Sequence, residues 1–191
     1  GKQTAGKQAA EVKNNLQLRR DSNLSIKFSG LITKKILSNE LIKSFALPKK
    51  IHGTIFSKST SGMKYGRHID NAYMSSGRAD LSFTVFLNCK KKYEGGALSI
   101  QGLNSEEKFK LDAGEIIIYP STYLHSVEKV IDGERLVFIG WIESYVKSIE
   151  EREYLFDLDA AARSLLAKYG RSEEVDLIYK SYSNFLRRLG N

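Results

Sequence analysis

Two short stretches of this sequence carry residue types that bind metal ions. His68 and Asp70 stand two residues apart in the run YGRHIDN, which spans residues 65–71. In a β-strand, residues i and i+2 project from the same face, so this imidazole and this carboxylate would lie side by side. A His-x-Asp pair by itself is more often a hydrogen-bonded surface pair, so the argument for a metal site needs a third ligand.

His125 supplies that third ligand. It follows the run GEIIIYP at residues 114–120, which has the pattern of a buried strand and turn, and it opens another short strand. Late strands lie opposite early strands in a jelly roll, so His125 can face His68 and Asp70. Two histidines and one carboxylate that leave further coordination positions open form the facial triad of non-haem iron(II) oxygenases. A structural zinc site would instead be closed by four protein ligands.

Arg135 lies ten residues after His125, at the start of the last expected strand. A guanidinium that faces the interior of a barrel needs an anionic partner, because an unpaired buried charge is costly. A dicarboxylic acid that chelates the metal at one end would present its far carboxylate there, and the guanidinium fork suits that group. Taken alone, Arg135 would more often pair with Glu134, Glu143 or solvent; its combination with the triad favours a site for an oxo-acid.

The elements that must position these side chains form an α+β, mainly β chain. Between residues 51 and 142 the sequence reads as short β-rich runs separated by turn residues, and eight such runs in this length predict a double-stranded β-helix, or jelly roll. An open meander is the alternative, but it would leave sheet edges to protect. The expected strands centre on residues 51–57, 64–70, 81–87, 97–101, 107–111, 115–119, 124–130 and 135–142.

Helices are expected on both sides of this core. Residues 1–50 should form a basic arm followed by two helices, the first capped by Asp21 or Ser22 and the second ending before Pro48. Residues 144–191 carry two apolar stripes at helical spacing, and residues 51–143 form the dioxygenase core. Both flanking segments are expected to pack on that core. The stripes consist of Leu155, Leu158, Ala162, Leu165 and Tyr169, and of Val175, Ile178, Tyr182, Phe185 and Leu189.

Composition limits the classes of protein to consider. Residues 1–50 hold 11 Lys/Arg against 3 Asp/Glu, so the whole net charge of +8 lies there. Few aromatic residues accompany this charge, so a solvated face is favoured and nucleic-acid binding is not expected. No apolar run approaches the roughly 18–20 residues of a membrane span, and no leader is recognisable. A single cysteine, Cys89, suits a reducing compartment, so we expect a cytoplasmic location.

Several runs resemble one family of enzymes. The runs YGRHIDN, LSFTVFLN, YEGGALSI, GEIIIYPSTYLHSVEKV and GERLVFIGWIES, with the head TAGKQAAEVKNN and the tail EREYLFDLDAAARSL, are similar to PKHD-type hydroxylases. These belong to the prolyl-4-hydroxylase-like branch of the iron(II)- and 2-oxoglutarate-dependent dioxygenases. The resemblance implies iron ligands at His68, Asp70 and His125 and a 2-oxoglutarate anchor at Arg135. It also implies hydroxylation of a prolyl or similar residue, or of a small molecule, with release of succinate and CO2, often with ascorbate (vitamin C) dependence.

The chain departs from that pattern at one place. Related prolyl hydroxylases often carry a tyrosine near the far carboxylate of 2-oxoglutarate, on the strand that here contains Phe86; Thr84 is the nearest polar alternative. Asp70 is present, whereas many halogenases of the superfamily lack this carboxylate, so hydroxylation is favoured. His52 has no partner at i±2 and is expected to be an ordinary strand residue. The expected substrate-facing rim consists of Asn71, Tyr73, Arg78 and the loop at residues 90–93.

Two other functions compete with this interpretation. A nucleic-acid demethylase of the same superfamily typically carries a second arginine six residues after the first, and that position here holds Trp141. A non-catalytic, cupin-like binding or sensor module would usually offer His-x-His, whereas this chain has Asp70 at the second place. Measuring succinate release with and without iron would separate an enzyme from such a module.

Overall fold

A computed structural model describes Gly1, residues 10–102 and residues 104–191, so the first part of the expected basic arm, residues 2–9, lies outside the described residues. The chain divides into two compact units. The first contains residues 1–32 and 51–143, and the second contains residues 33–50 and 144–191. None of the described helices is both long and apolar enough to cross a membrane.

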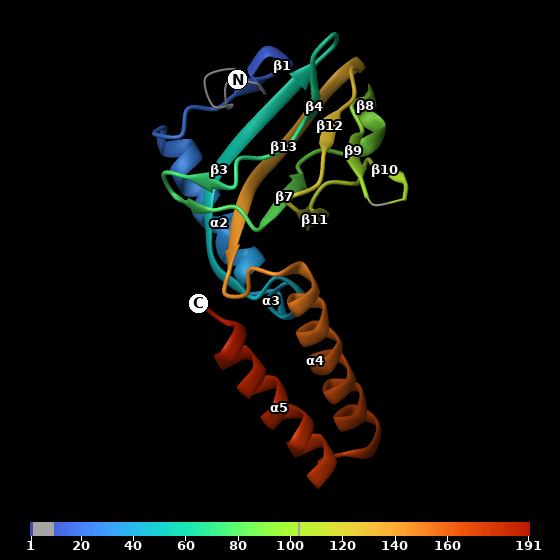
Figure 1. Ribbon diagram of the computed structural model, residues 1–191. Coiled ribbons are helices and arrows are strands. Elements are labelled where there is room, and N and C mark those ends of the chain that lie inside the picture. The colour runs from blue at the N-terminus through green and yellow to red at the C-terminus, as the bar shows by residue number, and fades with distance from the viewer. Residues whose placement is uncertain (2–9, 103) are drawn as a thin grey trace. The chain divides into compact units, whose positions relative to one another are not determined.

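The first unit is a jelly roll built from a five-stranded and a six-stranded sheet (Figure 1). Each of the eight strands expected from the sequence is confirmed. The five-stranded sheet runs in the order β1 (Lys13–Asn14), β4 (Lys64–His68), β12 (His125–Val127), β9 (Leu98–Gln101) and β10 (Glu106–Phe109). The six-stranded sheet runs in the order β11 (Ile116–Pro120), β7 (Leu81–Phe86), β13 (Val130–Ser144), β3 (Pro48–Thr60) and β2 (Leu16–Gln17), and its sixth strand, β8 (Tyr93–Gly95), pairs with β13.

The six-stranded sheet holds most of the large core side chains. β7 pairs with β11 on one edge and with β13 on the other. Every residue from Leu81 to Phe86 is buried, so both faces of this strand are covered. A buried strand of this kind shows a continuous apolar run with small polar residues rather than strict alternation. The ring of Phe138 on β13 lies 4.7 Å from that of Phe56 and 5.9 Å from that of Phe83, measured between centroids. This core fixes the sheet from which Arg135 projects.

The basic arm expected at the start of the chain contains two short strands that pair with the jelly roll. β1 pairs with β4 in the register Lys13 to Tyr65, and β2 pairs with β3 in the register Leu16 to Lys58. The amide of Gly66 also donates to the carbonyl of Val12, at 2.9 Å. Strands of two residues bond through backbone groups alone, so they leave no periodic pattern in the sequence.

Smaller elements complete the first unit. β5 (Tyr73–Met74) and β6 (Gly77–Arg78) form a hairpin, and a short 3-10 helix, η2, covers Lys90–Lys92. α2 (Asn23–Leu37), of which residues 23–32 belong to this unit, begins as expected after Ser22, whose hydroxyl accepts a hydrogen bond from the amide of Ser25.

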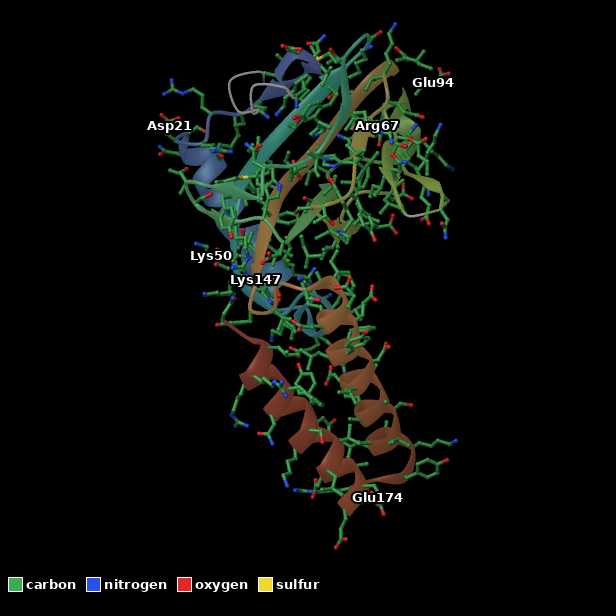
Figure 2. The ribbon with its side chains drawn as sticks, viewed as in Figure 1. Asp21, Lys50, Arg67, Glu94, Lys147 and Glu174 are labelled. Atoms are coloured by element: carbon green, nitrogen blue, oxygen red, sulfur yellow. The ribbon has the colours of Figure 1, made fainter. Side chains whose placement is uncertain are left out.

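The second unit is helical, with α3 (Glu40–Ala46), α4 (Ile149–Tyr169) and α5 (Glu173–Leu189). Its core is formed by Leu47, Val146 and Leu155, against which side chains of α5 pack. Figure 1 shows α4 and α5 running side by side, in orange and red. Glu174 lies at the start of α5 (Figure 2), where a hydrogen bond from Ser172 lowers the pKa of its carboxyl.

The two C-terminal apolar stripes are buried only in part. Leu155 and Ala162 of α4 are fully buried, but Tyr169 is 68 % exposed, and Phe185 of α5 is 46 % exposed. Packing of the flanking helices on the jelly roll stays a prediction.

Candidate active site

A cavity of about 530 Å³ opens in the first unit between the two sheets. His68 on β4 and His125 on β12 reach it from the five-stranded sheet. Thr84 on β7 and Arg135 on β13 reach it from the six-stranded sheet. The cavity therefore holds the predicted metal-binding and anion-binding residues together. Its size is in the range of sites for drug-sized ligands, and larger than a five-carbon dicarboxylate requires.

Strand register brings the two histidines together. His125 pairs directly with His68 across β12 and β4, and the centroids of the two rings lie 4.3 Å apart. The pairing shifts between His125 and Val127, a β-bulge of the kind that often redirects a side chain beside a functional site. Register across a bulge depends on backbone geometry, so the sequence spacing could not give it.

Backbone carbonyls fix the protonation of both rings. Nδ1 of His68 lies 2.8 Å from the carbonyl of Gly66, and Nδ1 of His125 lies 3.0 Å from the carbonyl of Tyr123. A carbonyl only accepts, so each Nδ1 must donate its proton, and each Nε2 keeps a lone pair for a metal ion. Burial and the neighbouring His125 lower the pKa of His68 to about 4, so its ring is neutral at neutral pH.

Asp70 is the third member of the metal-binding group, but it does not lie on the strand face where the sequence predicted it. β4 ends at His68, so Asp70 lies just beyond the strand rather than on its face. Its Oδ2 atom accepts hydrogen bonds from Oγ of Ser82, at 2.6 Å, and from Nε1 of Trp141, at 2.9 Å. Both donors belong to the six-stranded sheet. They position the Asp70 carboxylate, which the backbone of β4 cannot do because the strand ends before Asp70.

The three side chains fit one metal ion. Their ligand atoms all lie within 4.8 Å of one another, and Nε2 of His125 lies 3.8 Å from Oδ2 of Asp70. A metal–nitrogen bond measures about 2.1 Å, so two ligand atoms on the same face of an ion would stand about 3 Å apart. Side-chain rotations that draw the three groups closer together would bring them onto a single ion. Two imidazoles and one carboxylate also leave coordination positions open, as the facial triad requires.

Trp141 belongs to the site. In the sequence it was noted only because a nucleic-acid demethylase would have an arginine at that position. Its ring lies against Gly53 of β3, where a Cβ would stand 2.6 Å from Cε3 of the indole. Gly53 has a φ of +64°, a conformation that favours glycine. The close approach of β3 to the indole therefore depends on this glycine, and the indole in turn holds Asp70.

Arg135 projects into the cavity from a tight setting. Its side chain is 3 % exposed, and its Cζ atom lies 5.5 Å from the ring centroid of Phe86. Gly96, with a φ of +65°, makes room for it, because a Cβ there would stand 3.2 Å from Cδ of Arg135. Its Nε atom has no hydrogen-bond partner among the described residues. Burial lowers the pKa of the guanidinium, and an anion in the cavity would offset that cost.

Two hydroxyls share the cavity wall with Arg135. Thr84 was expected as the polar alternative to Phe86, and the structure places it on the wall. Tyr119 of β11 was missed; it also lines the cavity, and its ring centroid lies 5.2 Å from that of His125. Burial raises the pKa of Tyr119 well above its usual value, so its hydroxyl stays protonated and can donate. The apolar run IIIYP indicated a strand, but it shows no alternation that would say which side chains face inward.

The expected rim residues separate into two groups. Asn71 and Tyr73 line the cavity. Arg78 instead pairs with Asp80, at 2.7 Å, and Lys90 pairs with Asp112, at 3.1 Å. The loop at residues 90–93 is not among the described residues that line the cavity.

His52 stands apart from the metal triad. Its Nε2 donates to the carbonyl of Arg78 and its Nδ1 accepts from Oγ of Ser76, both at 2.8 Å. His52 therefore ties the β5–β6 hairpin to β3, and this strand residue carries a structural role.

Comparison with known proteins identifies the family. The model of the 2OG-Fe(II) oxygenase superfamily matches residues 54–143, and that of the PKHD-type hydroxylase C-terminal domain matches residues 150–190. A PKHD-type hydroxylase of Prochlorococcus marinus strain MIT 9215 is 77 % identical over 190 residues, which cover 100 % of this chain and 86 % of that protein. The chain belongs to the PKHD-type hydroxylases. A relative from strain MIT 9515 is 72 % identical over 191 residues, with the same coverage.

The hydroxylase also shares its fold with a solved structure. A prolyl-4-hydroxylase of Pseudomonas putida superimposes with a TM-score of 0.52 at 18 % identity, covering 70 % of this chain and 74 % of that one. At this identity the match supports the jelly-roll fold alone. Family membership makes the protein an iron(II)- and 2-oxoglutarate-dependent dioxygenase, so the non-catalytic, cupin-like alternative is set aside.

Proposed function

We propose that this enzyme hydroxylates an amino-acid residue, prolyl or similar, or a small molecule, and converts 2-oxoglutarate to succinate and CO2. His68, Asp70 and His125 bind the iron, and Arg135 binds the far carboxylate of 2-oxoglutarate. One observation carries the proposal. Two imidazole Nε2 atoms and one carboxylate converge in the same cavity as a buried guanidinium whose Nε lacks a partner among the described residues.

The ligand residues are prepared for a metal ion before it binds. Iron(II) and 2-oxoglutarate, when bound, supply the activation of dioxygen that a hydroxylation needs. The carbonyls of Gly66 and Tyr123 keep both Nε2 lone pairs directed into the cavity. Ser82 and Trp141 both donate to Oδ2 of Asp70 and so hold the carboxylate beside the two histidines. Such supporting bonds orient metal ligands and tune their affinity.

The co-substrate is oriented from the other sheet. Arg135 offers a planar fork to the far carboxylate, and the hydroxyls of Thr84 and Tyr119 on the same wall can add hydrogen bonds. The apolar part of the cavity wall includes Leu98, Val127 and Val137. An apolar wall excludes water, which strengthens the guanidinium–carboxylate pair. Asn71 and Tyr73 are then left to contact the substrate.

Succinate release provides the direct test. The purified protein is incubated in air with 2-oxoglutarate, with and without iron(II), and succinate and CO2 are quantified. We expect slow iron-dependent release without a substrate, and faster release with a peptide or metabolite that gains one oxygen atom by mass. Absence of iron-dependent succinate would contradict the proposal. Ascorbate dependence can be measured in the same assay, and a cytoplasmic location stays a prediction.

The Trp141→Phe variant tests the support of Asp70. Phenylalanine keeps a ring against Gly53 but removes the N–H that donates to Asp70. We expect iron(II) affinity to fall about 10- to 100-fold, as is usual when a residue that supports a metal ligand is lost. Anaerobic iron titration measures this, and a thermal melt of the metal-free variant controls for folding. Unchanged iron affinity would show that Ser82 alone is enough to hold the carboxylate.

A further inference from the structure

A second buried polar group lies next to Arg135. Tyr93, at the start of β8, is 5 % exposed and is not among the described residues that line the cavity. Its hydroxyl oxygen is buried and completes no hydrogen bond among the described residues, and the same holds for Nε of Arg135. Buried polar atoms of this kind are uncommon in folded proteins, so a neighbouring pair of them points to a role.

The pairing of β8 with β13 brings the two side chains together. Tyr93 pairs with Gly133, and Arg135 lies two residues farther along β13, so both side chains leave the same face of the sheet as diagonal neighbours. A Cβ on Gly96 would stand 3.3 Å from Cε2 of Tyr93 and 3.2 Å from Cδ of Arg135. The phenol and the guanidinium therefore border the same small space, which this glycine leaves open.

Lys110 holds the tyrosine in place. This residue follows β10, and its Nζ atom donates to the carbonyl of Tyr93, at 2.6 Å. The same Nζ atom lies 4.3 Å from the centroid of the Tyr93 ring, in a cation–π contact. The ring is therefore fixed at its backbone and across its face, and its hydroxyl has a defined position beside Arg135.

The two groups already influence each other. Burial raises the pKa of the Tyr93 hydroxyl, so it stays protonated at neutral pH, and the guanidinium of Arg135 opposes this rise by its charge and by a hydrogen-bonding interaction. That interaction is poorly aligned, since neither the hydroxyl nor Nε completes a hydrogen bond. A small movement of the guanidinium is enough to align the two groups.

We propose that Tyr93 is a positioning residue for Arg135: its hydroxyl accepts a hydrogen bond from the guanidinium when the far carboxylate of 2-oxoglutarate binds. A two-pronged carboxylate pair uses two of the five N–H donors of an arginine, so a further N–H is left for the phenol oxygen. The hydroxyl then fixes the plane of the fork. This inference rests on the proposed function and adds a residue that acts through Arg135 without touching the co-substrate.

A purely structural role for Tyr93 makes a different prediction. If the ring only fills the space beside Gly96, phenylalanine replaces it without loss. Tyr93→Phe keeps the ring and its contact with Lys110 but removes the hydroxyl. The metal-free variant should melt at or above the temperature of the parent, because the lost hydroxyl completes no hydrogen bond in that state.

The test compares two oxo-acids of equal length. Iron-loaded protein is titrated anaerobically with 2-oxoglutarate and with 2-oxopentanoate, which chelates iron in the same way but lacks the far carboxylate. Binding is followed by charge-transfer absorption. We expect Tyr93→Phe to bind 2-oxoglutarate about tenfold or more weakly than the parent, as for a lost hydrogen bond to a charged group. Its affinity for 2-oxopentanoate and for iron(II) should be unchanged.

Two further measurements sharpen the comparison. In air, the KM for 2-oxoglutarate should rise by a similar factor in Tyr93→Phe, while succinate release at saturation stays within about twofold, because Tyr93 touches no reacting atom. Tyr182→Phe is the matched control. Its hydroxyl also has a pKa raised by burial, but it belongs to the second unit and does not line the cavity, so neither oxo-acid should bind differently.

Three results would overturn the inference. Unchanged 2-oxoglutarate affinity in Tyr93→Phe would show that the hydroxyl does not act on Arg135. Equal losses for both oxo-acids would place the effect at the metal or in a distorted cavity, whatever the melting temperature. A parent protein that gives no absorption with 2-oxoglutarate would overturn the proposed function as well, and this is recorded before any variant is compared.

Discussion

The Asp70→Ala variant should bind iron(II) roughly 100-fold or more weakly than the parent and should release no measurable succinate. Asp70 is the sole carboxylate among the described residues on the cavity wall, so no neighbouring acid can replace it as a ligand. The substitution also leaves the N–H of Trp141 and the O–H of Ser82 without their acceptor. Iron content after anaerobic loading and succinate release in air are the two measurements.

A second variant separates loss of the ligand from loss of structure. Asp70→Asn keeps the shape of the side chain and one oxygen that can still accept from Ser82 and Trp141, but it removes the negative charge. We expect its thermal melt to match the parent and its iron affinity to fall nearly as far as in the alanine variant. Full iron content and activity in either variant would show that the triad is misassigned.

The strands of this fold were predictable because each satisfies local rules. The runs around β7 and β13 are rich in β-branched and aromatic residues, and turn residues such as Ser61-Gly62 separate neighbouring strands. The grouping of His68 with His125 also followed from the fold class, because a jelly roll has few ways to arrange its strands. Periodicity and topology together therefore indicated which residues meet.

The support of the triad was not predictable, because it depends on three-dimensional contacts. Asp70 was expected on a strand face, yet two donors from β7 and β13 hold it after the strand has ended. Nothing in local spacing connects residue 70 with residues 82 and 141. Tyr119 was missed for a similar reason, since the inner face of β11 is set by its register with β7, in which Tyr119 pairs with Ser82.

The contribution of the N-terminal segment shows a different limit. Lys13 reaches the cavity wall through a two-residue strand, and polarity alone made its surroundings resemble a solvated arm. The sequence revealed the excess of basic residues over 1–50, but not that one of them is buried. Pairing of short strands is decided by the exposed edge that β4 offers, and that edge exists only once the sheet has formed.

The Arg135→Ala variant should bind 2-oxoglutarate far more weakly while keeping its iron. Arg135 is not a ligand, so the three metal-binding groups remain in place. Loss of one member of a desolvated charge pair costs roughly 2–5 kcal/mol, which corresponds to a roughly 30- to 5000-fold weaker affinity. Titration of 2-oxoglutarate into iron-loaded protein under anaerobic conditions, followed by charge-transfer absorption, measures this loss.

Two milder variants test the geometry of the same contact. Arg135→Lys keeps a positive charge but loses the two-pronged fork of the guanidinium. The lysine side chain is also shorter, so its ammonium would lie closer to the space beside Gly96 than the guanidinium does. We therefore expect a modest loss of affinity, smaller than for alanine. Tyr119→Phe removes one hydroxyl and should cost less still, about 0.5–1.5 kcal/mol, if that hydroxyl donates to the carboxylate.

Should Arg135→Ala bind 2-oxoglutarate as tightly as the parent, the far carboxylate lies elsewhere. Lys13 and Arg20 would then be the cations to test, because they are the other positive charges among the described lining residues.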